Sequence, residues 1–357
     1  MRWRRFRSVV LVSVVGLLAA CAAPTAAPPQ APPGPLTQAD QVKVAKHIEQ
    51  AKGHLAVALA AYQAGDMAHA KLHAGHPSQE NLDVLEAPLK ARDPALATAL
   101  RQSLPAPVQA LESRPNAPAF ERAVADAGER LDQALRALVP AQVLADTSFR
   151  ALVLLEMLEA VREEYGEAVE GGKVVSPEEY QDAYGFFVRA RSLYQEIGAA
   201  LAPDTRRQTE EEFSNLARAL PGFAHPSSPV PLDRVQGWTE SLARKLADAT
   251  GVQIKRTDPV AEVATIKGYL DRILTTYEQG NAARATELAA EMYLDHYEKI
   301  EYMIIEKAPK LNGTLEPLLA SKIRARIKAG APVSELAALV RQAQAALDDA
   351  GKVLAGP

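Results

Sequence analysis

The stretch YEQGNAARATELAAEMYLDHYEKIE, residues Tyr277–Glu301, has a counterpart earlier in the chain, YQAGDMAHAKLHAGHPSQENLDVLE, residues Tyr62–Glu86. The offset between them, 215 residues, holds over the whole stretch without a gap. In both copies a glycine is followed by Asp or Asn, the pattern of one helix ending and the next beginning at its N-cap. The repeat predicts two related helical units on either side of a middle region.

The composition favours helices over strands. Hydrophobic residues make up 48% of the 357 residues but aromatic residues only 5%, and alanine and leucine dominate. β-Branched runs with a period of two are almost absent, so we expect an all-α fold. Helical patterns and loops divide the chain into two up-and-down bundles related by the internal repeat, an N-terminal bundle over residues 38–140 and a C-terminal bundle over residues 145–357.

The N-terminal sequence has the features of an export signal. Four arginines precede an apolar stretch over residues 9–20, which ends in Leu18-Ala19-Ala20-Cys21. That ending resembles the lipobox of bacterial lipoproteins, so residues 1–21 are predicted to be a lipoprotein signal peptide whose Cys21 becomes acylated, for example with palmitate. An ordinary secretory signal with a chance cysteine is the alternative. Alanines after Cys21, with no aspartate beside it, suit the outer membrane by analogy with such lipoproteins.

The predicted mature protein is acidic and lacks thiols. Residues 22–37 are rich in Ala and Pro and form a predicted spacer of roughly 45 Å between the lipid anchor and the bundles. Removing the four signal arginines takes the formal charge from −4 to −8, which argues against a nucleic-acid partner and favours cations. Cys21 is the only cysteine, so disulfides within the chain and thiolate metal sites are excluded.

Candidate metal ligands follow the glycine turn in both repeat copies. In the first copy, His73, His76, Glu80 and Asp83 share one helical face, which Pro77 interrupts, and Glu86 is a further candidate because it matches Glu301 of the second copy. Imidazole and carboxylate on one face would suit iron, zinc or copper. The second copy keeps the acids Asp295, Glu298 and Glu301 beside tyrosines. Carboxylates with tyrosines would suit a hard cation such as ferric iron or calcium. For both faces the alternative is a solvated polar surface.

The middle region has an acidic stripe of its own. Its members lie at helical spacing and are Glu156, Glu159, Glu163, Glu167 and Glu170. Like charges on one face destabilise a helix unless cations compensate them. A surface face is the interpretation that the spacing favours here.

The same region resembles a known family. Glu164-Tyr165-Gly166-Glu167, then Gly172-Lys173-Val174-Val175, then Glu179-Tyr180 resemble the extracytoplasmic domain of bacterial high-affinity iron permeases. Tyr293-Leu294-Asp295 through Glu298 and Glu301 resemble a later motif of that domain, so the resemblance spans about residues 146–354. A looser likeness links the chain to imelysin-like periplasmic iron-uptake proteins. The resemblance implies iron handling in the cell envelope.

Two family features are missing. The chain has no Arg-Glu-x-x-Glu motif of the permease membrane helices, so it is not expected to transport iron itself. The His-x-x-Glu motif of imelysin-like proteins is replaced by His76-x-x-x-Glu80. The resemblance therefore leaves the ligand set open.

No catalytic motif stands out: Gly-x-Ser-x-Gly, His-Glu-x-x-His and phosphate-binding glycine loops are all absent. The sequence predicts a non-enzymatic envelope lipoprotein that binds or delivers a metal ion, with iron first and other divalent or trivalent cations as alternatives. An iron permease or another envelope protein is the expected partner, besides the membrane. The rival interpretation is a scaffold that uses its helical surfaces for protein partners, because the glycine turn also resembles tetratricopeptide repeats. No 34-residue period supports that likeness.

Overall fold

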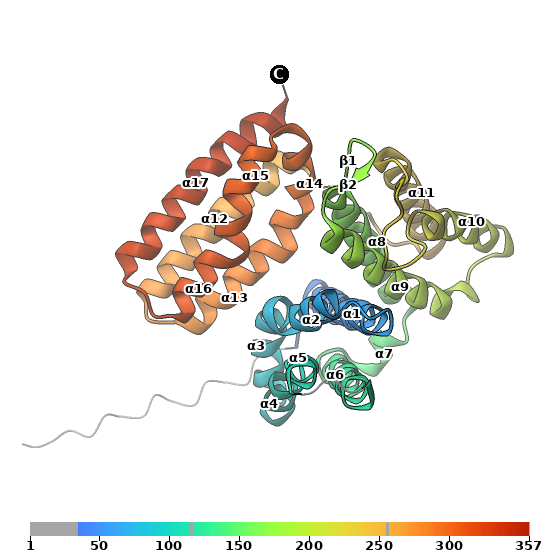
Figure 1. The fold of residues 1–357 in the computed structure, drawn as a ribbon, viewed down its shortest axis with the longest axis horizontal. Helices are drawn as coiled ribbons and strands as arrows, with labels where there is room; N and C mark the ends of the chain where they lie inside the picture. Colours follow the sequence, from blue (N-terminus) through green and yellow to red (C-terminus); the bar gives the residue numbers. More distant parts are fainter. Residues whose placement is uncertain (1–34, 114–116, 255–256, 357) are drawn as a thin grey trace, which may run out of the picture. The chain divides into compact units, whose positions relative to one another are not determined.

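The structure is a computed structural model that describes residues 35–113, 117–254 and 257–356. The regular secondary structure of these residues is helical, apart from a two-stranded antiparallel hairpin of β1 (Val169–Glu170) and β2 (Lys173–Val174) (Figure 1). The all-α prediction is confirmed. Cys21, the rest of the predicted signal peptide and residues 22–34 of the predicted linker lie outside the described residues. Within the described ranges, none of the helices combines the length and apolar character needed to cross a bilayer.

The first repeat unit contains six α-helices and one π-helical turn. They are α1 (Gln38–Gln63), α2 (Met67–His76), η1 (Pro77–Asn81), α3 (Leu82–Arg92), α4 (Pro94–Ser103), α5 (Ala106–Glu112) and α6 (Ala117–Leu138). The interruption predicted at Pro77 is the π-helical turn η1.

The middle segment contains four long helices after a short one. They are α7 (Ala141–Leu144), α8 (Thr147–Ala168), α9 (Pro177–Gly198), α10 (Pro203–Ala219) and α11 (Leu232–Thr250), with the hairpin between α8 and α9. The sequence starts α9 as expected, because the Ser176 hydroxyl accepts a hydrogen bond from the backbone N–H of Glu179 at 3.4 Å. This cap also fixes where Glu179 lies.

The second repeat unit returns to the pattern of the first. Its elements are α12 (Pro259–Glu278), α13 (Ala282–Met292), η2 (Tyr293–Tyr297), α14 (Glu298–Lys307), α15 (Pro309–Glu316), η3 (Pro317–Lys322), α16 (Ile323–Lys328) and α17 (Val333–Ala355).

The predicted repeat is confirmed in the backbone. Gly65 and Gly280 both end helices in the left-handed region, at φ of +82° and +80°, a conformation that glycine adopts without the steric cost of a Cβ. The next residue caps the following helix in both copies: Asp66 accepts the N–H of His69 at 3.2 Å, and Asn281 accepts that of Arg284 at 3.1 Å. A π-helical turn then follows in both. The similarity continues to α6 and α17, well beyond the quoted stretch.

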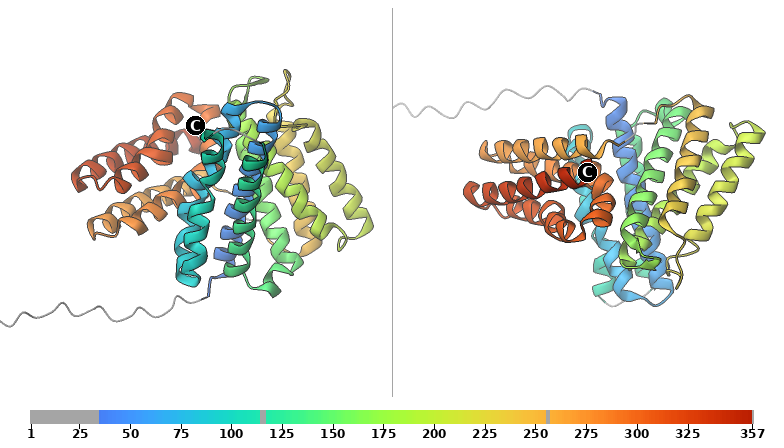
Figure 2. Two further views of the ribbon diagram at one scale, coloured as in Figure 1. Left: turned by 60° about the horizontal axis from the view of Figure 1, so that its bottom comes forward. Right: turned by 90° about the horizontal axis from the view of Figure 1, so that it is seen from above.

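The apolar cores divide the chain at a different place from the predicted domain boundary. One large core runs from Val44 on α1 to Leu246 on α11, so the first unit and the middle segment share it. A second core runs from Val263 to Leu354, within the second repeat unit. The boundary between the cores falls after α11, whereas the sequence placed the division of the bundles at residues 140–145. The reason is that α1 packs against α8 and α9 as well as against its own unit (Figure 2).

Two glycines allow α1 and α9 to lie unusually close. A Cβ placed on Gly185 would lie 2.7 Å from the carbonyl oxygen of Gly53 and from Val57 Cγ2. A Cβ on Gly53 would lie 2.9 Å from Phe186 Cδ1. No real Cβ makes such contacts, so the two backbones touch where the helices cross. The neighbouring positions, including His54, are thereby brought close to α9.

Candidate metal-binding cavity

A cavity of about 260 Å³ is lined by residues from both repeat units and the middle segment. Among the described residues that line it, Arg324 is the single lysine or arginine. The carboxylates of the lining are Glu80, Glu164, Glu167, Glu178, Glu179, Asp182, Glu298 and Glu316. These eight carboxyl groups outnumber the three basic groups of the lining, which are Arg324 and the imidazoles of His54 and His76. The lining therefore suits a cation and disfavours an anion.

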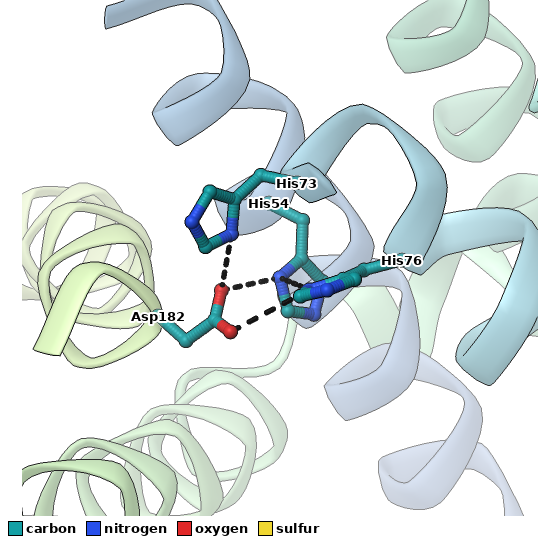
Figure 3. A group of neighbouring side chains, drawn as sticks. All are labelled: His54, His73, His76 and Asp182. Carbon is teal, nitrogen blue, oxygen red and sulfur yellow. Dashed lines mark hydrogen bonds and ion pairs between the residues drawn. The ribbon is translucent and has the colours of Figure 1, made fainter. Parts of the chain in front are cut away.

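Four buried side chains from three helices converge beside this cavity, and His54, His76 and Asp182 among them line it (Figure 3). We call them the histidine set: His54 from α1, His73 and His76 from α2, and Asp182 from α9. Asp182 Oδ1 lies 2.6 Å from His54 Nδ1 and 3.0 Å from His73 Nδ1, and its Oδ2 lies 3.5 Å from His76 Nδ1. One ligand atom from each residue lies within 4.8 Å of all the others. A common ion about 2.1 Å from each atom requires the four ligand atoms to lie closer together than this, so the side chains would move inward on binding.

The outer nitrogens of the same imidazoles also face oxygens. Nε2 of His73 lies 2.6 Å from Gln181 Oε1, that of His54 lies 3.4 Å from Glu80 Oε2, and that of His76 lies 3.1 Å from Glu178 Oε1. These three oxygens are acceptors. A neutral imidazole has one N–H donor and one acceptor nitrogen, so donation to the outer oxygen leaves its Nδ1 lone pair aimed at Asp182. Either a second proton or a cation must lie between them.

This arrangement is typical of metal-bound histidines, whose second N–H is held by a carboxylate or a carbonyl oxygen that fixes the ring. Nδ1 of His54 and Nδ1 of His76 also lie only 3.3 Å apart. Two protonated rings at that distance would repel each other, whereas a shared cation would attract both nitrogens.

Without a cation, protons balance the charge of the histidine set. Burial alone would lower the pKa of His54, but Asp182 outweighs it and raises that pKa to about 9. Burial is likewise outweighed at His76 by Glu80 and Asp182, which raise its pKa to about 12. The pKa of Asp182 is held well below its usual range, because the three histidines overcome the effect of its burial. A cation that binds here must displace protons.

A second group lines the cavity one helical turn along α9. Glu164 and Glu167 of α8 and Glu179 of α9, the carboxylate set, each offer an oxygen within 4.8 Å of the other two. Burial, followed by repulsion from Asp182 and Glu178, raises the pKa of Glu179 to about 8. Burial, followed by repulsion from neighbouring carboxylates, also raises the pKa values of Glu164 and Glu167 well above the usual range.

In the second repeat unit, the residues at the positions that correspond to the histidine set surround a lysine. At the constant offset, His54, His76 and Glu80 correspond to Tyr269, Glu291 and Asp295. The ammonium group of Lys43 lies 3.4 Å from Glu291 Oε2 and 3.1 Å from Asp295 Oδ2. A cation supplied by the chain itself therefore lies at the duplicated position. In the first unit, α9 brings Asp182 and Glu178 to this position instead of a lysine.

The structure brings together part of the predicted ligand set. His73 and His76 belong to the histidine set, and Glu80 and Glu298 line the same cavity. Glu301 is buried, where its Oε1 accepts a hydrogen bond from Asn312 Nδ2 at 2.9 Å.

The other predicted ligands have basic partners. Asp83 lies 2.8 Å from Lys328 Nζ, and Glu86 pairs with Arg101. Asp295 lies 3.0 Å from His47 Nε2 as well as beside Lys43. None of the three is among the residues that line the cavity.

Sequence reasoning missed His54, Asp182 and the carboxylate set as ligands. His54 and Asp182 lie 128 residues apart and share no motif. A signal for the carboxylate set was present, because Glu164, Glu167 and Glu179 all fall within the motif that resembles the iron permease domain. The middle acidic stripe was interpreted as a surface face, yet Glu163 is buried and Glu167 lines the cavity.

Comparison with known families agrees with that motif. Residues 140–253 match the model of a family described as an iron permease-associated 4-helix bundle domain. The predicted resemblance is confirmed over these residues. The match covers α8 to α11, which are the four long helices of the middle segment, and with them Asp182 and the carboxylate set. The second quoted motif, Tyr293 to Glu301, lies outside the matched residues. Neither the curated proteins nor the solved structures contain a match.

Proposed function

We propose that this protein binds iron in the cavity and passes it on without catalysing a reaction. The observation that carries the proposal is the histidine set, in which three imidazole nitrogens and a carboxylate converge while the outer nitrogens are already held by oxygens. Imidazole with carboxylate suits ferrous iron, zinc and copper. The iron permease-associated segment, which supplies Asp182, favours iron among these.

The position of Lys43 supports the proposal that the ligand of the histidine set is a cation. The second repeat unit uses the same helical positions to surround an ammonium group, whereas the first unit presents nitrogen and oxygen donors with no lysine or arginine among the four residues. The duplicated positions are thus suited to positive charge in both units. In the first unit that charge must come from outside the chain.

The match of the middle segment also supports the choice of partner. A segment associated with iron permeases suits a protein that gives its ion to a permease or takes it from one. The predicted lipid anchor at Cys21 would place the cavity in the cell envelope, on the periplasmic face of the outer membrane or on the cell surface.

The test is cation-dependent stability of the compact unit, residues 34–357. A cation at a hundredfold excess over Kd should add about 2.7 kcal/mol to the free energy of unfolding, or about 4 °C in Tm. We expect this with ferrous iron under anaerobic conditions. The variant His54→Gln/His73→Gln should lose the rise, whereas His225→Gln, at an exposed histidine outside the cavity, should keep it. A wild-type Tm unmoved by ferrous, ferric, zinc, copper and calcium ions would refute the proposal and favour the scaffold interpretation.

Cation binding should release protons. Because the folded-state pKa values of His54 and His76 are raised from 6.5 to about 9 and about 12, the apo protein loses stability as the pH rises above about 6.5. A cation replaces those protons, so its affinity should increase over pH 6 to 8. Titration of Zn²⁺ into weakly buffered protein at pH 7 with an indicator dye should show at least one proton released per ion. Binding with no proton release would contradict the assigned ligands.

Cys21→Ser tests the anchor. The thiol is the site of acylation in the predicted lipobox, and a serine cannot be acylated in the same way. We expect the variant to leave the membrane fraction or to accumulate with its signal peptide uncleaved, as measured by fractionation and intact mass. A variant that is processed and sediments with membranes like the wild type would rule out the lipid anchor.

A further inference from the structure

The carboxylate set has no counter-charge of its own. Among the described residues, no lysine, arginine or histidine lies within ion-pair distance of Glu164, Glu167 or Glu179. Glu298 of α14, which lines the same cavity, also lacks such a partner. Acidic clusters on protein surfaces are usually solvated, but these side chains lie at least partly buried in the cavity. Something other than a basic side chain must compensate them.

Two buried amides independently indicate a ligand. Gln50 Oε1 and Asn81 Oδ1 have no hydrogen-bond partner among the described residues, and their residues are only 2% and 1% exposed. Both residues line the cavity. A buried carbonyl oxygen without a donor carries a free-energy cost that native proteins rarely leave uncompensated. Amide carbonyl and carboxylate oxygens together are the ligands that hard cations prefer.

We propose that the cavity binds two cations at once, a borderline divalent ion at the histidine set and a hard, oxygen-preferring ion at the carboxylate set. Ferric iron and calcium share the chemistry of the second site. The first half of this statement rests on the proposed function, whereas the second site has ligands of its own. Glu179 and Asp182 lie one turn apart on α9, which separates the two positions by about 5 Å. Nitrogen donors at one and oxygen donors alone at the other would keep the two ions distinct.

The charge of the lining fits two ions better than one. Eight carboxyl groups and one arginine line the cavity, and a single divalent ion at the histidine set would leave the carboxylate set to be neutralised by protons alone. The result is a cavity that holds one ion at nitrogen-rich ligands and another at oxygen ligands.

The experiment uses two probes with the residue 34–357 protein. Zn²⁺ reports on the histidine set by elemental analysis after dialysis. Tb³⁺ reports on the carboxylate set by luminescence sensitised through Tyr293, which also lines the cavity. We expect one Zn²⁺ and one Tb³⁺ per chain, bound together. Glu164→Gln/Glu167→Gln should weaken Tb³⁺ at least tenfold and retain Zn²⁺, and His54→Gln/His73→Gln should do the reverse.

The control is Glu210→Gln/Glu211→Gln, two exposed acids of α10, which should bind both probes like the wild type. Far-UV circular dichroism verifies that each variant is folded. Displacement of Tb³⁺ by ferric nitrilotriacetate, by Ca²⁺ or by both supports a hard-cation site and identifies its natural ion.

Three results would overturn the second site: no Tb³⁺ binding, Tb³⁺ displaced by neither competitor, or Zn²⁺ and Tb³⁺ that exclude each other and are lost together in either variant. The last of these leaves the proposed function intact. Tb³⁺ binding with neither Zn²⁺ nor ferrous iron bound would instead refute the assigned histidine set and leave the second site standing.

Discussion

Gly185→Ala should destabilise the protein by about 1–3 kcal/mol and weaken cation binding at the same time. The new Cβ would lie 2.7 Å from the carbonyl oxygen of Gly53. That atom belongs to the backbone of α1 and cannot rotate away, so the two helices must separate. This separation moves His54 away from Asp182. In the wild type, His54 Nδ1 and Asp182 Oδ1 lie 2.6 Å apart. Urea unfolding and Zn²⁺ titration of the same preparation measure both effects.

Gly128→Ala provides the matched control. Gly128 is also a helical glycine, but nothing lies within 4 Å of the position of its Cβ. Alanine there should stabilise the protein by about 0.5–1 kcal/mol, because it removes the conformational freedom of a mid-helix glycine. Cation affinity should not change. If Gly185→Ala proves as stable as Gly128→Ala, the close crossing of α1 and α9 is wrong.

Asp182→Asn should lower cation affinity about 100-fold or more, because this carboxylate contacts all three imidazoles of the histidine set. The apo protein should also lose stability. His54 has its pKa raised from 6.5 to about 9, chiefly by Asp182 acting against burial. At 1.36 kcal/mol per pKa unit, the loss is on the order of 3 kcal/mol.

The pH dependence distinguishes this effect from a general packing defect. A raised histidine pKa contributes stability that is complete below pH 6.5 and is lost as the pH rises through about 9. The lowered pKa of Asp182 contributes stability that is present at neutral pH and lost only as the pH falls below its usual range. The difference between wild type and Asp182→Asn should therefore be largest near pH 6 and smaller above pH 9, where the contribution of His54 is lost and that of His76, whose pKa is raised to about 12, remains.

Asp132→Asn is the matched control for Asp182→Asn. Asp132 forms an ion pair with Lys52 at 2.8 Å and is partly exposed, away from the cavity. Its replacement should change stability by less than about 1 kcal/mol and leave cation affinity unchanged. A difference between wild type and Asp182→Asn that stays constant from pH 5 to pH 10 would contradict the assigned role of the histidine set.

Local features of this protein could be predicted from its sequence. Gly65 and Gly280 end helices, and Asp66 and Asn281 cap the next ones, because these interactions join residues a few positions apart. The same holds for Ser176 at the start of α9. Such contacts depend on backbone sterics and short side chains, so they are the same in any fold that contains the segment. The all-α class and the repeat follow from them.

Only the tertiary structure decided which polar faces meet. His73 and Glu80 were recognised from helical spacing, but their partners His54 and Asp182 come from two other helices. Spacing could not reveal that Asp295 is neutralised by Lys43, Lys46 and His47, about 250 residues away in the chain. Nor could it show that Glu163 and Glu167 turn inward rather than toward solvent.

The sequence by itself therefore determined the helices, their caps and the duplication, whereas the tertiary structure decided the ligand set. The physical reason lies in the range of the interactions involved. A cap is made within one turn of the chain, but the charge and ligation of a buried carboxylate depend on every group within a few ångströms of it. In this protein those groups are brought together by the contact of Gly53 with Gly185 and by the docking of α1 against residues of the second repeat unit.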